Sequence, residues 1–195
     1  MEHVDDEATG RPEPGSEDTR RERFETLVAE VVEPVRRFLA RRTDPANADD
    51  VLADTLLVVW RRLDQVPDPA LPWVYGVAKN CLANAERSDR RQRRVAARIS
   101  VVDPPQDAVP LPDDGNAAVD AALEALRPEE AELLRLWAFE QLGPAEIAEV
   151  LGVTPNAVSI RLHRARGKLL AELRKIQDAG GHEGVRGRRE RDDRA

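Results

Sequence analysis

The chain has 195 residues, of which 34% are charged and 4% aromatic, and its net charge is −7. This length suits one domain or two small ones, and so many charges with so few aromatic side chains predict an all-α protein with modest hydrophobic cores. The longest apolar run, TLLVVW, is too short to cross a bilayer, which excludes insertion into a membrane.

The first 20 residues contain seven acidic side chains against two arginines and have no apolar stretch. We expect a disordered tail over 1–20, with neither a signal peptide nor a transit peptide, and therefore a cytoplasmic protein. Cys81 is the single cysteine, so neither an internal disulfide nor a cysteine-based zinc site is expected, and a small buried helix residue is its predicted role.

Apolar residues recur at helical spacing over 21–98, which is the predicted first domain. Within ADDVLADTLLVVWRRL, residues 48–63, one apolar stripe faces a core, whereas Leu57 points away from it and Asp50 and Asp54 share the far side. A helix that is apolar beyond one stripe needs either a deep core or a partner. Packing within a small bundle and docking on another protein are therefore both open for this helix.

The next segment, LPWVYGVAKN at 71–80, precedes a run of arginines. Aromatic rings stack on exposed bases and arginines hold phosphates, so this pattern favours binding of a nucleic-acid strand with unpaired bases. Core packing is the alternative for the two aromatic residues. The candidates are Trp73, Tyr75, Asn80, Arg87, Arg90 and Arg91.

A change of composition separates the two halves of the chain. Segment 99–118 is rich in proline and aspartate and contains no lysine or arginine, which predicts an extended, flexible linker. Helical periodicity returns over 119–176, the predicted second domain. The last segment, 177–195, mixes glycine with both charge signs and has no apolar period, so a disordered tail is expected.

The second domain contains a helix-turn-helix pattern. Pro144 opens a short helix that ends at Gly152, and Thr154 is the predicted cap of a longer helix whose first residue is Pro155. Apolar residues of the longer helix fall on one stripe, and the opposite face is polar and basic. That face and its flanks carry Asn156, Ser159, Ile160, Arg161, His163, Arg164 and Arg166.

The charge of this second helix favours DNA as its ligand. Its cations outnumber its acids by five between Arg161 and Lys175, and a basic helix after a glycine turn suits a major groove flanked by phosphates. An ordinary solvated helix face is the alternative. His163 is predicted to contact DNA rather than a metal, because the other two histidines lie in the tails; no metal, cofactor or catalytic residue is expected.

At these motifs the chain resembles the RNA polymerase sigma factors of the extracytoplasmic-function (ECF) type, reduced members of the sigma-70 family. DDVLADTLLVVWRRL resembles region 2.2 of that family, LPWVYGVAKN resembles regions 2.3 and 2.4, and LGPAEIAEVLGVTPNAVSIRLHRARGKL resembles region 4.2. Region 4.2 alone also resembles other helix-turn-helix regulators. The pair of blocks, joined by an acidic linker, is much more specific.

The resemblance implies a monomer that binds core RNA polymerase, on its β′ clamp and β flap, and promoter DNA, under control of an anti-sigma factor. Residues 21–98 would form the region 2-like domain and 119–176 the region 4-like domain. The residues implied for clamp docking are Asp50, Asp54 and Leu57. Those implied for the minus-ten strand are Trp73, Lys79, Asn80, Arg87, Arg90 and Arg91. Those implied for the minus-thirty-five element are Asn156, Ser159, Ile160, Arg161, His163, Arg164 and Arg166.

The chain departs from the family pattern at several positions. Gly76 replaces an arginine of the minus-ten stretch, and Ser159-Ile160 replaces a basic residue followed by serine. An outward isoleucine cannot donate a hydrogen bond, but it can touch a thymine methyl group. We expect Arg164 to reach base edges or the innermost phosphates, and Lys168 to touch only the DNA backbone.

Three other classes of function compete with a sigma factor. A free-standing helix-turn-helix regulator would use the same DNA-binding helix, but it would not need the first block and would dimerise on a palindrome. A protein-binding adaptor would explain the exposed leucine but not the arginine run. An enzyme is not expected, because no nucleophile accompanies a recognisable base.

Overall fold

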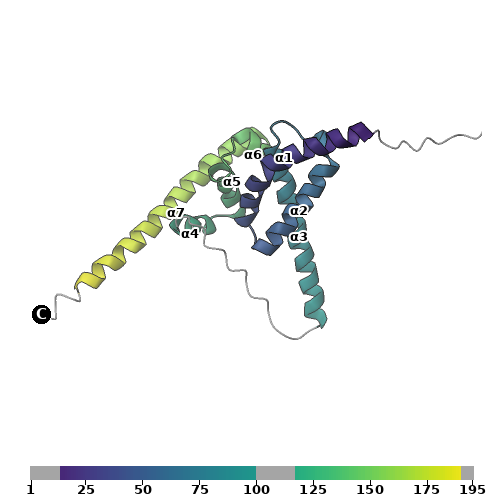
Figure 1. The fold of residues 1–195 in the computed structure, drawn as a ribbon. Helices are drawn as coiled ribbons and strands as arrows, with labels where there is room; N and C mark the ends of the chain where they lie inside the picture. Colours follow the sequence, from purple (N-terminus) through teal and green to yellow (C-terminus); the bar gives the residue numbers. More distant parts are fainter. Residues whose placement is uncertain (1–13, 100–116, 190–195) are drawn as a thin grey trace, which may run out of the picture.

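The computed structural model describes residues 14–99 and 117–189 as helices joined by short connections (Figure 1). Its α-helices are α1 (Pro14–Ala40), α2 (Pro45–Arg61), α3 (Leu71–Ile99), α4 (Ala117–Glu124), α5 (Pro128–Ala138), α6 (Pro144–Leu151) and α7 (Pro155–Arg189), and a 3-10 turn, η1 (Leu63–Gln65), follows α2. These two described ranges contain no strand, so the all-α prediction is confirmed there.

Helices α1, α2 and α3 pack together as the first block. Helix α2 starts at Pro45, after Asp44, whose side chain accepts a hydrogen bond from the backbone N–H of Asn47 at 3.1 Å. Its inward stripe, which includes Val59, is buried together with Val35 and Phe38 of α1. This apolar interior holds α2 with its other face outward.

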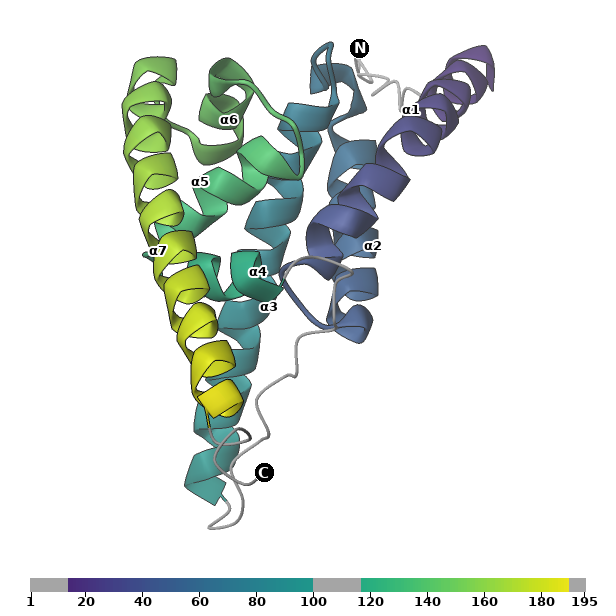
Figure 2. The same ribbon diagram turned by 90° about the vertical axis from the view of Figure 1, so that its left-hand side faces the viewer.

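Helices α4 to α7 form the second block, in which α7 packs against each of the other three (Figure 2). Leu134 and Leu136 of α5, Ile147 of α6, and Val158 and Ala165 of α7 are buried between them. Every one of these positions belongs to an apolar stripe of its helix, so amphipathicity alone accounts for which faces meet.

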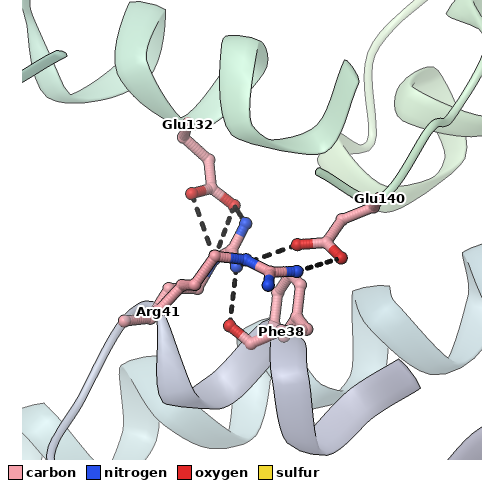
Figure 3. Close-up of polar contacts among 5 residues, drawn as sticks. Phe38, Arg41, Glu132 and Glu140 are labelled. Carbon is pink, nitrogen blue, oxygen red and sulfur yellow. Dashed lines mark hydrogen bonds and ion pairs between the residues drawn. The ribbon is translucent and has the colours of Figure 1, made fainter. Parts of the chain in front are cut away.

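The two blocks share one continuous hydrophobic core. Helix α6 packs directly on α3, which brings the second block against the first (Figure 2). Four charged side chains also pair at this contact: Arg41 and Arg42, directly after α1, and Glu132 and Glu140 from the second block (Figure 3). The sequence patterns predicted two separate domains joined by a flexible linker. Residues 100–116 of that linker lie outside the described residues.

Helix bounds differ from the expected tails at both ends. Helix α1 begins at Pro14, inside the tail expected over 1–20. Arg20, in the same segment, donates to Asp64 Oδ2 at 3.0 Å and to the carbonyl oxygen of Trp60 at 2.8 Å, which ties this part of α1 to the end of α2 and to η1. Helix α7 continues through most of the tail expected over 177–195, since that segment contains no proline to stop it. Residues 1–13 and 190–195 lie outside the described residues.

Candidate nucleic-acid interface

The helix-turn-helix pattern predicted from the sequence is present in α6 and α7. The N–H of Gly143 donates to Glu146 Oε2 at 2.7 Å at the start of α6, and Gly152 ends that helix with a φ of 65°. The backbone N–H of Ala157 donates to Thr154 Oγ1 at 3.3 Å, which caps α7 as expected. The glycine turn therefore sets the angle at which α7 leaves α6.

The outer face of α7 is open over its first three turns. The buried stripe contains Val158, Leu162 and Ala165, whereas Ile160 is 46% exposed. Every residue expected on the DNA-facing side is exposed: Asn156, Ser159, Ile160, Arg161, His163, Arg164 and Arg166. The structure thus brings these seven side chains to the exposed surface of one helix.

Ser159, Arg166 and Lys168 of α7 already have partners within the protein. Ser159 donates its hydroxyl hydrogen to the carbonyl oxygen of Pro155 at 3.0 Å, so toward DNA it can only accept. The guanidinium of Arg166 lies 4.6 Å from the ring centroid of Trp137. Lys168, expected on the DNA backbone, forms an ion pair with Glu130 of α5, and its hydrogen bond lowers the pKa of that carboxyl group.

Residues of α3 expected at the minus-ten strand do not form one cluster. Trp73 packs half-buried against the core, Lys79 is half-buried and Asn80 is exposed. Arg87 lies 14 residues, or about 21 Å, further along the helix than Trp73. The three arginines of this set are exposed: Arg87, Arg90 and Arg91. These side chains are therefore spread along the length of α3 rather than gathered in a single pocket.

Tyr75 is a core residue, which decides between the two interpretations left open for it. Its ring lies 5.0 Å from that of Phe38, and the side chain is buried. Burial, with a further contribution from the negative charge of Glu140, raises the pKa of Tyr75 to about 12. The residue is thus unavailable for stacking on a base in this arrangement.

Tyr75 is the single tyrosine of the chain, so its ionisation can be followed directly by absorbance near 295 nm. We expect the titration of the folded protein to give a pKa of about 12 for Tyr75, compared with about 10 in the unfolded chain. Because the folded pKa is the higher one, its contribution to stability is present below pH 10 and is lost as pH rises toward 12. A midpoint near 10 in both native buffer and urea would contradict the burial of this ring.

The acidic and apolar face expected on α2 is also exposed. Asp50, Asp54 and Leu57 all face outward, and Leu57 is 51% exposed, so packing within the bundle does not account for it. Trp60, one turn further on, extends this face; its ring meets Phe24 edge-on at a centroid distance of 5.1 Å. Trp60 is not among the residues predicted for docking from the sequence, although its spacing of three from Leu57 indicates the same helix face.

The described residues hold no group of three or more histidine, cysteine, aspartate or glutamate side chains that could bind a metal ion. Among them, no helix has both the length and the apolar character needed to cross a bilayer. Cys81 is half-buried rather than fully buried, and its partial burial raises the pKa of its thiol.

Residues 116–169 match the family model of sigma-70 region 4, a range that spans α4, α5, α6 and most of the basic part of α7. The chain is 32% identical over 149 residues to the ECF RNA polymerase sigma factor SigL of Mycobacterium tuberculosis, which covers 72% of this chain and 82% of SigL. It is 31% identical over 172 residues to the RNA polymerase sigma factor CarQ of Myxococcus xanthus, which covers 82% of this chain and 94% of CarQ.

The chain belongs to the ECF sigma factors of RNA polymerase. This confirms the resemblance seen in the sequence motifs. Among solved structures, this sigma factor is similar to RpoE in complex with the anti-sigma factor NepR from Bartonella quintana, with a TM-score of 0.58 and 18% identity over 77% of this chain and 96% of that one. It is also similar to CnrH in complex with the cytosolic domain of CnrY, with a TM-score of 0.50 and 26% identity over 80% and 88% of the two chains.

Proposed function

We propose that this ECF sigma factor binds core RNA polymerase as a monomer and recognises two promoter elements. Helices α1 to α3 would act as the region 2-like domain and α4 to α7 as the region 4-like domain. The observation that carries the proposal is the coexistence of two separate outward faces, apolar and acidic on α2 and basic on α7. A free-standing regulator needs only the second face.

Gel filtration with purified core polymerase, followed by run-off transcription from genomic fragments, tests the proposal. We expect a one-to-one complex and initiation that requires no ATP hydrolysis for promoter opening. A stable homodimer that ignores core polymerase and protects a palindrome with two-fold symmetry would instead identify a free-standing regulator.

Helix α7 would read the minus-thirty-five element through Arg164 and Ile160. Within the described residues Arg164 is exposed and forms no hydrogen bond or ion pair that would hold it away from a groove, and it lies on the face opposite the buried Val158 and Leu162. Arginine binds guanine through two parallel hydrogen bonds, whereas the apolar Ile160 can only touch a thymine methyl group. Replacing these two side chains should therefore change promoter binding in different ways.

Arg164→Ala should weaken binding by about 1 to 3 kcal/mol at promoters with the preferred base and much less at others. Ile160→Ser should instead tolerate cytosine in place of thymine without changing the salt dependence. Lys168→Ala is the matched control: because Lys168 is paired with Glu130, the log-log salt slope should fall by less than about one unit. Measuring how each of the three variants binds a panel of single-base promoter changes at two salt concentrations tests these expectations. An equal loss of affinity in all three would contradict the proposed rotation of α7 in the groove.

An anti-sigma factor is the proposed regulator of this chain. Two of the solved structures that resemble it hold a sigma factor together with NepR or with the cytosolic domain of CnrY. The exposed Leu57 and Trp60 are costly to leave in water, which favours a protein that covers them. A pull-down from unstressed cells should recover such a partner, and recovery of polymerase subunits alone would count against it.

A further inference from the structure

Four arginines lie over aromatic rings in the part of the chain that the structure describes, and Arg166 differs from the other three. Each of those three also forms an ion pair with a carboxylate: Arg20, Arg41 and Arg42. The guanidinium of Arg166 lies 4.6 Å from the ring centroid of Trp137 on α5, and within the described residues it forms no hydrogen bond or ion pair. Its N–H donors are therefore free to bind a ligand outside the chain.

A cation–π contact orients an arginine without neutralising it. The ring attracts the positive charge through its quadrupole and carries no net charge of its own. A carboxylate instead cancels the charge of the cation that it binds, as Glu130 does for Lys168 on the same helix. Arg166 is thus held against α5 with its full charge and its donors available for an anion.

Arg166 lies at the edge of the DNA-facing side of α7 rather than at its middle. It follows Ser159 by seven residues and His163 by three, so these side chains form one row along the helix. At 100° per residue, Arg166 is turned by about 120° from Ile160, whereas Arg164 is turned by about 40°. A side chain at the edge of a helix in the major groove faces the phosphates that flank the groove, not the base edges.

Trp137 reaches this edge from the buried side of α7. Helix α5 packs against α7 (Figure 2), and its Leu134 and Leu136 are buried in the core. Trp137 comes directly after them and is 38% exposed, so its ring lies where the core meets the surface. Because tryptophan has only two rotatable side-chain bonds and α5 is fixed by its buried neighbours, the ring is a rigid support for the long arginine side chain.

We propose that Trp137 is a positioning residue for promoter binding. It holds Arg166 at the edge of α7, where the guanidinium binds a backbone phosphate of the minus-thirty-five element. The inference rests on the proposed function of α7 and adds a residue from outside the helix-turn-helix. A side chain that a ring already holds loses less rotamer entropy on binding than a free one. Because phosphate contacts carry no sequence information directly, Arg166 strengthens binding to every promoter, in contrast to Arg164.

A double-mutant cycle tests the proposal, with saturating core polymerase and a duplex that carries a promoter found by run-off transcription. Arg166→Ala should weaken binding about tenfold, equally across single-base promoter variants, and lower the log-log salt slope by about one unit. Trp137→Leu keeps an apolar side chain but removes the ring, and it should weaken binding about threefold or more. In the Arg166→Ala background the same change should cost less than about twofold.

Two further variants separate positioning from packing. Trp137→Tyr keeps an aromatic face, so binding should return to within about twofold of wild type. Phe139→Leu is the matched control: Phe139 is 37% exposed and its ring faces Arg41 rather than a cation of α7, so its loss should leave DNA binding unchanged. Circular dichroism should show equal helix content in all variants. An equal loss from Trp137→Leu with and without Arg166 would mean that the ring only packs α5 on α7, and would overturn the positioning role.

The contact can also be measured without DNA, by NMR of the free chain. The ring current of the indole should shift the side-chain signals of Arg166 upfield, and Trp137→Leu should return them to the positions of an unconstrained arginine. Absence of this shift in the wild-type chain would overturn the positioning role whatever the DNA result. If the wild-type chain with core polymerase binds no promoter, the proposed function fails and the phosphate contact fails with it, whereas the NMR shift still decides whether Trp137 holds Arg166.

Discussion

Leu57→Glu should lower the affinity of the chain for core RNA polymerase at least tenfold. The leucine is 51% exposed on a helix whose inward stripe already fills the core, so the substitution should leave the fold intact. In the proposed complex it would place a carboxylate in an apolar contact beside Asp50 and Asp54, where desolvation and like charge both oppose binding. Titration of labelled chain with core polymerase measures the change.

Leu170→Glu provides the matched control for this prediction. Leu170 is 56% exposed, on α7 rather than on the docking helix, and the same change of charge there should alter core affinity by less than about threefold. Circular dichroism should show equal helix content in both variants. Equal affinities for Leu57→Glu and Leu170→Glu would remove α2 from the docking surface.

Phe38→Ala should destabilise the chain by about 3 to 5 kcal/mol, the largest stability effect we expect from a single substitution. The ring is fully buried, lies 5.0 Å from that of Tyr75, and has the Arg42 guanidinium 3.6 Å from its centroid. Its removal leaves a cavity beside the ion pairs of Arg42 and takes away the aromatic face on which Arg42 lies. Urea unfolding followed by circular dichroism gives the change in the free energy of unfolding.

Phe139→Ala is the comparison for this second prediction. Phe139 is 37% exposed, and its ring centroid lies 5.0 Å from the guanidinium of Arg41. Because little apolar area is lost there, we expect a cost below about 1.5 kcal/mol. Similar costs for the two phenylalanines would mean that Phe38 does not lie at the centre of the core.

The helix-turn-helix could be predicted from the sequence in detail because its determinants are local. Pro144, Gly152 and Thr154 act within one or two turns of their own positions, through fixed φ angles and a capping hydrogen bond. The buried stripe of α7 follows from the helical period alone. The outward position of Leu57 on α2 follows in the same way.

Only the tertiary structure decided how the two blocks meet. The ion pairs of Arg41 and Arg42 with Glu132 and Glu140 join residues 90 to 99 positions apart. Nothing near Arg42 in the sequence distinguishes it from the many other arginines of the chain. The sequence left both base stacking and core packing open for Tyr75, and its position beside Phe38 decides for the core. In the sequence Gly76 is only a departure from a family pattern, whereas in the structure the backbone of α6 passes close to it. Local rules set the faces of each helix, but the pairing of faces depends on long-range burial, and its partners cannot be named from helical periodicity.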